Sequence, residues 1–497
     1  MANSPTQQSL YPIARQSVVC GLCAAVIAGI VFFSAAAALA FFVVVVTAGM
    51  LWRSDQPPIL SFCLAYQWIF IVTGYFYRHL TGSYPGLAYV GNLDGAVVLS
   101  LVGLLVFGIG IRSGAHCLRY RTAARAYRLQ QLDSLLNLQR LFWLVIATHA
   151  VSWLVQISPM EIQFNAAQFI YRILEFRTVL FFLLLLMIVR QQSGYPYGAI
   201  AFLFVLIPSL ASQMSHFKEV FFLLFLALLS EWRPWSKLAV ERLRSLRMVT
   251  TGICLAAALL VMGTIWEGGI KPIWRPSITS GLVQGTPMDK VEAGMPIFQQ
   301  ALASLDWLAA ANLLAARMSS GAGYFSLVLD QVPRLLPHED GVLTMRALEH
   351  VLKPRFIFPE KINLGSDSWL VRQYAGVYVA GEESGTSVGL GYMAQFYIDF
   401  AMPGMFVAIF LYGLIVGLMY QGLLLFSPSY NFYSSAVTII LTQHLVSYEG
   451  EIAKLLGGIL QAFLVFAAIS YIFGPWLIRL LAMPGRPRLM PERVPTR

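Results

Sequence analysis

The sequence predicts an all-α polytopic membrane protein with about twelve transmembrane helices and one large, mainly helical loop outside the membrane. Of its 497 residues, 58% are hydrophobic and 12% are charged, whereas a soluble domain is about 45–50% apolar and about a quarter charged. Apolar runs recur along the chain, and a hydrocarbon core about 30 Å thick needs roughly 20 such residues per helix. The placement of Lys and Arg gives the orientation.

Twelve apolar runs have a length suited to a single crossing. The first two form one stretch without charge between Arg15 and Arg53. We divide this stretch around Ser34, because its length suits a tight helical hairpin. The predicted spans are 17–33, 35–52, 58–77, 94–111, 141–157, 170–189, 197–212, 218–232, 248–266, 403–425, 430–447 and 456–478.

Three polar segments carry most of the positive charge. Segment 112–140 has six Arg against one Asp, 233–247 has five Lys or Arg against one Glu, and 479–497 has five Arg against one Glu. By the positive-inside rule all three are cytoplasmic. They follow the fourth, eighth and twelfth spans, so both termini are expected in the cytoplasm.

This topology divides the chain into four parts and places one long segment outside. Residues 1–266 hold nine spans, 267–402 the extracytoplasmic loop, 403–478 three spans, and 479–497 a basic cytoplasmic tail. Residues 267–401 contain 10 basic and 13 acidic residues, a net charge of −3. Because the whole chain has a net charge of +10, the residues outside this segment have a net charge of +13. The positive charge is therefore mainly topogenic, and it gives no reason to expect nucleic acid as a partner.

The outer segment contains predicted helices. Thr286-Pro287-Met288-Asp289 reads as a helix start that Pro296 interrupts, and 297–318 is Ala- and Leu-rich. Another helix is expected from Gly341 to Leu352, because Pro354 stops it. Its apolar stripe is Val342, Met345, Leu348 and Leu352, and the opposite face carries Arg346, Glu349, His350 and Lys353. That face is either a solvated salt-bridge ladder or part of a binding site.

A run of cations, prolines and aromatics follows this helix. It reads Lys353-Pro354-Arg355-Phe356-Ile357-Phe358-Pro359-Glu360-Lys361. Prolines fix the backbone, and fixed cations suit a phosphorylated ligand. Further on are side chains that can stack on sugars or hydrogen-bond to them, although membrane anchoring is the more ordinary role of Tyr397. They are Tyr374, Glu383, Tyr392, Gln395, Tyr397 and Asp399.

Ionisable residues also lie in the outer halves of several predicted spans. Charges inside a bilayer are costly and mark a functional site or an internal pair. Because these residues share one depth, we expect a common cavity that opens outward. They are His149, Arg172, Glu175, Arg177, His216, Lys218, Glu219 and His444, with Glu449 and Glu451 just above.

Other motifs indicate little. Cys20 and Cys23 have CxxC spacing but lie in an apolar span without further metal ligands. The chain contains no P-loop, Rossmann fingerprint or HExxH motif. These observations disfavour an ATP-driven or zinc-dependent mechanism.

In three respects the chain resembles the Wzy-type O-antigen and exopolysaccharide repeat-unit polymerases. It has about twelve spans, a cation opening a span in Ser215-His216-Phe217-Lys218-Glu219, and a large outer loop. That loop holds KPRFIFPEK and then GTSVGLGYMAQFYIDFAMPGM entering the next span. The Arg-x10-Gly repeats of some members are absent, and so is the His-Asn motif of the related ligases. The second absence favours polymerase over ligase.

The resemblance implies a GT-C-like fold in the bacterial inner membrane. It implies transfer of a growing glycan from undecaprenyl diphosphate to the next lipid-linked repeat unit on the periplasmic side, without metal, nucleotide sugar or other cofactor. The partners would be undecaprenyl-diphosphate-linked oligosaccharide, the lipid bilayer, a repeat-unit flippase and a chain-length regulator. Two other readings stay open: a transporter or flippase for a lipid-linked or anionic solute, and a structural partner in an export complex.

The chemistry of such a transfer assigns roles to the candidate residues. Cations have to neutralise the leaving diphosphate, and a general base has to accept the proton of the acceptor hydroxyl. For the base the candidates are His350, Glu383 and Asp399, and for sugar contacts Tyr374, Tyr392, Gln395 and Tyr397. For the diphosphate they are Lys218, Arg177, Lys353 and Arg355, with Arg172 and Arg346 in reserve.

Overall fold

The computed structural model describes most of the chain and is helical throughout the described parts. These are residues 11–53, 56–118, 136–157, 170–210, 217–231, 239–274, 296, 299–353, 358, 367–381, 387–427 and 431–482. These described residues contain no β-strand, only one isolated antiparallel bridge between Leu136 and Ala482. A backbone that satisfies its own hydrogen bonds in helices is what a bilayer requires.

Six helices are long and apolar enough to cross a membrane, in agreement with an α-helical membrane protein. Each coincides with a predicted span. Their bounds are Ile59–Thr81 (α3), Leu93–Cys117 (α4), Leu138–Ile157 (α6), Ala239–Ile265 (α11), Tyr392–Phe426 (α17) and Ile452–Ile472 (α20), and the crossing segment of α11 continues to Trp274 through the π-helical turn Trp266–Ile270 (η2).

The other predicted spans also contain helices where they are described, and except for α1 these are shorter. The predicted break around Ser34 is confirmed, because α2 begins at Ala35 and the Ser34 hydroxyl accepts a hydrogen bond from the Ala37 amide at 3.3 Å. These helices are Tyr11–Phe32 (α1), Ala35–Leu51 (α2), Phe176–Gln191 (α8), Tyr195–Leu210 (α9), Phe217–Leu229 (α10), Asn431–Val437 (α18) and Thr442–Leu445 (α19), and a short helix Gly474–Leu481 (α21) follows α20.

Helices α4 and α17 pack with their backbones in contact. Each contributes two glycines four residues apart, the small-xxx-small pattern of closely packed membrane helices. A Cβ atom on any of the four would overlap a carbonyl oxygen of the other helix. Measured from a Cβ atom placed on the glycine, the distances are 2.4 Å for Gly110 to Phe410 O, 2.1 Å for Gly114 to Leu414 O, 2.4 Å for Gly413 to Phe107 O and 2.1 Å for Gly417 to Ile111 O.

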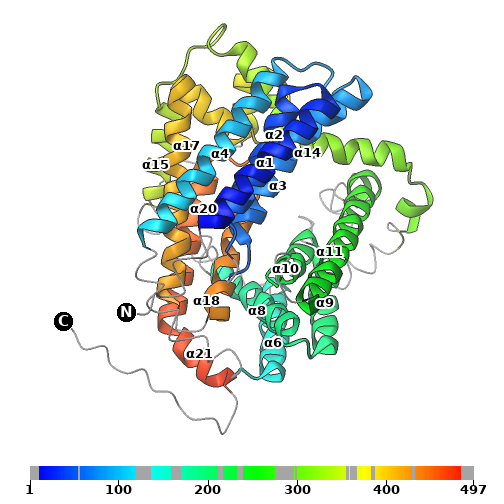
Figure 1. Cartoon of the computed structure of the whole chain (residues 1–497), viewed down its shortest axis with the longest axis vertical. Coiled ribbons are helices and arrows are strands. Elements are labelled where there is room, and N and C mark those ends of the chain that lie inside the picture. The colour runs from blue at the N-terminus through cyan, green and yellow to red at the C-terminus, as the bar shows by residue number, and fades with distance from the viewer. Residues whose placement is uncertain are drawn as a thin grey trace, which may run out of the picture.

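Figure 1 shows two groups of helices that α14 (Trp307–Gln331) joins. One group contains α1–α4, α17 and α20, and the other contains α6 and α8–α11. Helix α14 contacts α3 and α4 of the first group and α11 and η2 of the second. It is therefore the part of the outer segment that packs most closely against the predicted membrane helices.

The helix predicted over 297–318 differs from the observed structure. The chain breaks at 304–306, Asp306 caps a new helix by accepting hydrogen bonds from Leu308 N and Ala309 N, and α14 continues to Gln331. Gly321 and Gly323 look like helix breakers in the sequence. In the structure they lie against Tyr448 and Tyr84, where a side chain would collide, so close packing explains them. The helix start predicted at Thr286 lies outside the described residues.

Helix α15 (Val342–Leu352) forms as predicted, but its apolar stripe is not its packed face. Leu343 and Ala347 are the residues buried against the core, whereas Met345 is 66% exposed and Leu352 is 69% exposed. Helix α15 packs on α17 and α20, which the sequence does not specify. The face that the periodicity selected is therefore the outer face.

Helix α17 begins eleven residues before the predicted span. Its helical path is interrupted at Ala401, which has a φ of 53°, and at Met402, so the predicted boundary at 402 falls at a kink. Residues 392–400, the centre of the motif that carries the family resemblance, form the first helical part and are almost entirely buried.

Candidate functional site

Charged side chains from both helix groups meet beside α14. We call this set the ionic cluster. It comes from the start of α8, the start of α10, the turn η2, the middle of α14, and the loop before α20. Its members are Arg172, Glu175, Arg177, Lys218, Glu219, Glu267, Lys271, Arg317 and Glu449.

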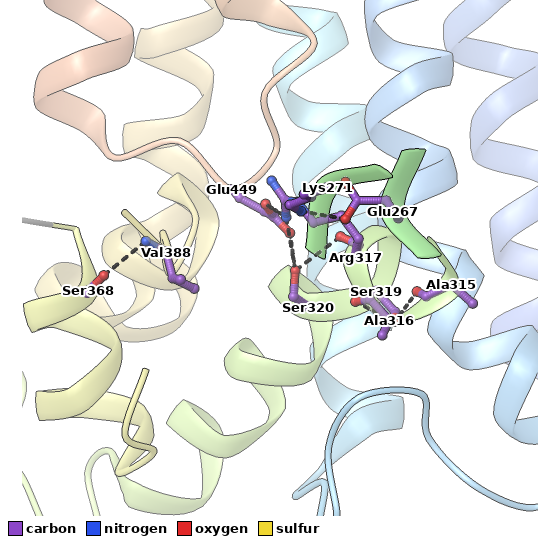
Figure 2. Close-up of polar contacts among 10 residues, drawn as sticks. All are labelled: Glu267, Lys271, Ala315, Ala316, Arg317, Ser319, Ser320, Ser368, Val388 and Glu449. Atoms are coloured by element: carbon purple, nitrogen blue, oxygen red, sulfur yellow. Dashed lines mark hydrogen bonds and ion pairs between the residues drawn. The ribbon is translucent and has the colours of Figure 1, made fainter. Parts of the chain in front are cut away.

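Three pairs inside the cluster are in direct contact. Arg172 Nη1 lies 2.8 Å from Glu175 Oε2, and Lys271 pairs with Glu267. Arg317 of α14 pairs with Glu449, which also accepts a hydrogen bond from Ser320 (Figure 2). Figure 2 shows these last two contacts and the Lys271–Glu267 pair close together.

The packing of α14 explains why Arg317 reaches Glu449. One turn further along α14, Gly321 lies against the ring of Tyr448, so close that a Cβ atom on Gly321 would be 2.7 Å from a ring carbon. The absence of a side chain at Gly321 lets the loop approach the helix. The hydroxyls of Tyr448 and Ser100 share a hydrogen bond of 2.7 Å, which fixes the loop to α4.

Two cations of the cluster have no ion pair or hydrogen bond among the described residues. Lys218 is exposed and lies within electrostatic range of Arg317, Glu449 and Glu267. Arg177 is partly buried, and its Nη1 atom is buried without a hydrogen-bond partner. A buried, unsatisfied guanidinium is costly, and an anionic ligand would satisfy it.

Charged residues of the predicted sixth and eighth spans therefore lie within electrostatic range of one another, whereas residues 211–216 of the turn before the eighth span lie outside the described residues. Two histidines lie beside these charged residues: His149 is 5% exposed near Arg177, and His444 lies near Arg172. His149 Nδ1 lies 2.9 Å from Val145 O, and His444 Nε2 is buried without a partner among the described residues. His216 lies outside the described residues.

The cations predicted on α15 do not join the ionic cluster. Lys353 is exposed and pairs with Glu349, and Arg346 is exposed on the same helix. Helix α20 separates α15 from the cluster, because its Gly457 faces Val351 whereas its neighbour Gly458 faces His444. Figure 1 likewise shows α15 on the opposite side of α17 from α10 and α11. Arg355 lies outside the described residues.

The three candidates for the general base have different surroundings. Asp399 is 1% exposed and accepts hydrogen bonds from Leu343 N at 3.0 Å, Thr344 N at 2.6 Å and the Thr344 hydroxyl. Its oxygens thus hold the start of α15 against α17. His350 is partly buried on α15, away from the cluster, and Glu383 lies outside the described residues.

The side chains predicted to contact sugars lie inside the protein and hydrogen-bond within it. Tyr374 donates to Glu339 Oε1 at 2.6 Å, and Tyr397 donates to Val332 O at 3.2 Å. Tyr392 donates to Gln67 Oε1 at 2.8 Å, and Gln395 accepts from Ile452 N at 3.0 Å. Three of the four are at most 3% exposed. Tyr392 and Gln395 connect the outer segment to α3 and α20, whereas Tyr374 and Tyr397 bond within the outer segment.

A second polar group lies on the other side of the same loop. The Asp367 carboxylate lies 2.7 Å from Lys454 Nζ, and Lys454 also donates to the Ser387 hydroxyl at 3.3 Å. Glu451 is hydrogen-bonded to Asp367. Burial and the neighbouring Asp367 raise the pKa of Glu451 from its usual 4.5 to about 8.

Several of these residues were not selected from the sequence. Arg317 had a usable signal, because it is the only charged residue between Asp306 and Asp330 in an apolar helix. Lys271 and Lys454 begin or border apolar helices and read there as ordinary flanking charges. Among the described residues, no group of three or more His, Cys, Asp or Glu is arranged to hold a metal ion.

Comparisons of the chain with protein-family models, curated proteins and solved structures give no match.

Proposed function

We propose that this protein is a polymerase of undecaprenyl-diphosphate-linked oligosaccharide repeat units, a metal-independent membrane glycosyltransferase of O-antigen or exopolysaccharide synthesis. The observation that carries the proposal is the convergence of Arg177, Lys218 and Arg317 from three helices, two of them without an ion pair among the described residues. The resemblance in the outer segment supports the same class.

The chemistry of the transfer explains why such a cluster is needed. When the bond between the anomeric carbon and the diphosphate breaks, negative charge develops on the leaving phosphate oxygens. Fixed cations stabilise that charge without having to reorganise. Arginine binds phosphate through two parallel hydrogen bonds, and lysine acts as a point charge. Arg177 and Lys218 fill these roles, with Arg172 in support and Arg317 added.

The remaining parts of the proposal concern topology. The protein crosses the bacterial inner membrane twelve times with both termini in the cytoplasm, has a GT-C-like arrangement, and presents 267–402 to the periplasm. The basic segments 112–140 and 233–247 support this orientation. A repeat-unit flippase supplies the substrate, and a chain-length regulator acts on the product.

Substitution in a strain that lacks the gene tests the proposal. Lys218→Gln and Arg317→Gln should each abolish polymer and leave single repeat units on the lipid, with unchanged protein level. Arg334→Gln is the matched control, because Arg334 is an exposed arginine of the outer segment away from the cluster, and it should support normal polymer. Polymer of wild-type chain length in both cluster variants would refute the diphosphate role.

The same strain separates the two proposed cation sets. Lys353→Gln should support nearly normal polymer, because Lys353 lies on α15 beyond α20. If instead it abolishes polymer while Lys218→Gln does not, the diphosphate site lies at α15.

A transporter of a lipid-linked or anionic solute is the second candidate. It is favoured by the acidic members of the cluster and by His149 and His444 beside it, because buried chains of carboxylates and imidazoles relay protons in transporters. Purified protein in liposomes distinguishes the two. New glycosidic bonds between lipid-linked repeats support the polymerase, and solute movement without them supports the transporter.

A further inference from the structure

The loop before α20 carries two carboxylates that lie in different surroundings. Glu449 belongs to the ionic cluster through Arg317, and Glu451, two residues later, contacts Asp367. Gly389 connects the two sides: a Cβ atom there would lie 2.1 Å from Glu449 O and 3.7 Å from Asp367 Oδ2. The carboxyl pair therefore adjoins the loop whose Glu449 pairs with Arg317, one of the cations that the proposed function assigns to the diphosphate.

We propose, resting on the function proposed above, that Glu451 is the general base that takes the proton from the acceptor hydroxyl, and that Asp367 is its positioning partner.

The contact between the two carboxyl groups constrains their protonation. Two carboxylates hydrogen-bond to each other only when one of them holds a proton. Asp367 forms an ion pair with Lys454 at 2.7 Å, and burial raises the pKa of Glu451, so the proton belongs on Glu451. Burial and Asp367 raise the pKa of Glu451 to about 8, which places its gain and loss of a proton near the working pH, as general base catalysis requires.

Accessibility also favours Glu451 as the group that touches substrate. Asp367 is 7% exposed and is held by Lys454, whereas Glu451 is partly exposed. Glu451 stands at the N-terminal end of α20, but its side chain makes no capping hydrogen bond there. Its carboxyl group is therefore free of the structural duty that occupies Asp399.

Few charged groups act on the protonation of Glu451. Asp367 and Lys454 are the charged groups that act directly on Glu451. The elements packed on α20 and the loop itself also carry charged or imidazole groups, namely Arg346, Glu349, His350 and Lys353 on α15, Asp399 on α17, His444 on α19, Arg479 on α21, and Glu449.

The proposed step conserves atoms and charge. The ionised Glu451 carboxylate accepts the proton of the acceptor hydroxyl as that oxygen forms a bond to the anomeric carbon of the donor glycan. The bond from that carbon to the phosphate oxygen breaks, and its electron pair leaves with the lipid diphosphate. Lys218, Arg177 and Arg317 stabilise the new charge, and Glu451 then releases its proton to water.

The test uses full-length protein in lipid nanodiscs and lipid-linked repeat units extracted from the strain that lacks the gene. Polymer formation is followed from pH 5.5 to 9.5, and binding of undecaprenyl diphosphate is measured separately. Glu451→Gln should reduce turnover by at least about 100-fold and change lipid binding less than about twofold. Glutamine has the shape of the protonated acid, so the variant should fold. Glu349→Gln, an exposed glutamate paired to a lysine on α15, should behave as wild type.

A second variant tests the role of Asp367 through the pH profile. In the wild type, turnover should rise with pH and level off above about 8, where Glu451 is ionised. Asp367→Asn removes the neighbouring negative charge, so it should move that rise to lower pH and lower the plateau. This result would support the pairing even if Glu451→Gln failed to fold.

The outcomes separate the two proposals. Wild-type turnover in Glu451→Gln, or an unchanged pH profile in Asp367→Asn, would overturn the assignment of Glu451 while leaving the polymerase intact. If the wild-type protein forms no polymer from lipid-linked repeats, the proposed function itself is wrong, and the assignment of Glu451 falls with it.

Discussion

The glycine contacts between α4 and α17 make a quantitative test of the fold possible. Gly417 lies so close to Ile111 that a Cβ atom would be 2.1 Å from its carbonyl oxygen. Real Cβ contacts are essentially never shorter than 3.0 Å, so Gly417→Ala has to move the two helices apart by about 0.9 Å at this point. The neighbouring contacts at Gly110, Gly114 and Gly413 have to open with it.

The expected cost of this substitution is the difference between two effects. Forcing a methyl group into a packed backbone contact costs about 1–3 kcal/mol, and here the upper value applies because backbone atoms cannot rotate away. Replacing glycine by alanine inside a helix returns about 1 kcal/mol. We therefore expect a net loss of about 2 kcal/mol.

A second glycine supplies the control that isolates the packing cost. Gly263 in α11 has only Leu314 side-chain atoms at 3.5 and 3.6 Å from a Cβ position, which is ordinary contact. Gly263→Ala should therefore gain the helical propensity without the collision. The two variants should differ by about 3 kcal/mol, or about 6 °C in Tm at roughly 2 °C per kcal/mol.

Thermal unfolding in one detergent, followed by tryptophan fluorescence, measures this difference. Gly417→Ala should melt below the wild type, and Gly263→Ala should melt at or slightly above it. Equal melting temperatures for the two alanine variants would refute the backbone contact between α4 and α17.

Three further predictions concern the outer segment and the loop before α20. Since burial and Asp367 raise the pKa of Glu451 from 4.5 to about 8, the folded protein binds more protons than the unfolded chain between these values, so Tm should fall as pH rises from about 4.5 to about 8 and this slope should shrink in Glu451→Gln. Asp399→Ala leaves the first amides of α15 without their acceptor, which should lower the free energy of unfolding by about 1–2 kcal/mol. Hydrogen exchange should become faster in α15 but not in α14, and an equal change in both helices would contradict this prediction. In a double-mutant cycle of Arg317→Gln and Glu449→Gln, melting temperatures should be non-additive because each variant strands one charge, and strict additivity would mean that the pair contributes nothing.

The apolar runs predicted the helices of the core well, for a physical reason. Each helix in a bilayer has to satisfy its own backbone and bury about 20 apolar residues, so its signal is local in sequence. The break at Ser34 and the end of α15 were predicted for similarly local reasons, a change in pattern and a following proline. The end of α14 was not, because Gly321 and Gly323 are explained only by the tyrosines that pack against them.

The candidate site was predictable only in part. The nearness of Arg172, Arg177 and Lys218 follows from a shared depth, which the sequence contains. The separation of Lys353 from them depends on which side of α20 receives α15, and no local pattern encodes that choice. For the same reason Tyr374 and Tyr392 resembled sugar ligands, although their hydroxyls are used in internal hydrogen bonds.

Helix α14 makes the two helix groups mechanically dependent on each other. At the four glycines of the α4–α17 contact backbone meets backbone and no side chain can turn aside, so these helices cannot slide past each other there without a collision. For the polymerase proposed above, any opening that admits a lipid tail or releases a lengthening chain therefore has to come from movement elsewhere in the protein. The Arg317–Glu449 pair joins α14, which packs against α4 and α17, to the loop before α20, and it lies beside η2 of the second group. On the function proposed above, a phosphate that bound Arg317 in place of Glu449 would break this link between α14 and the loop before α20.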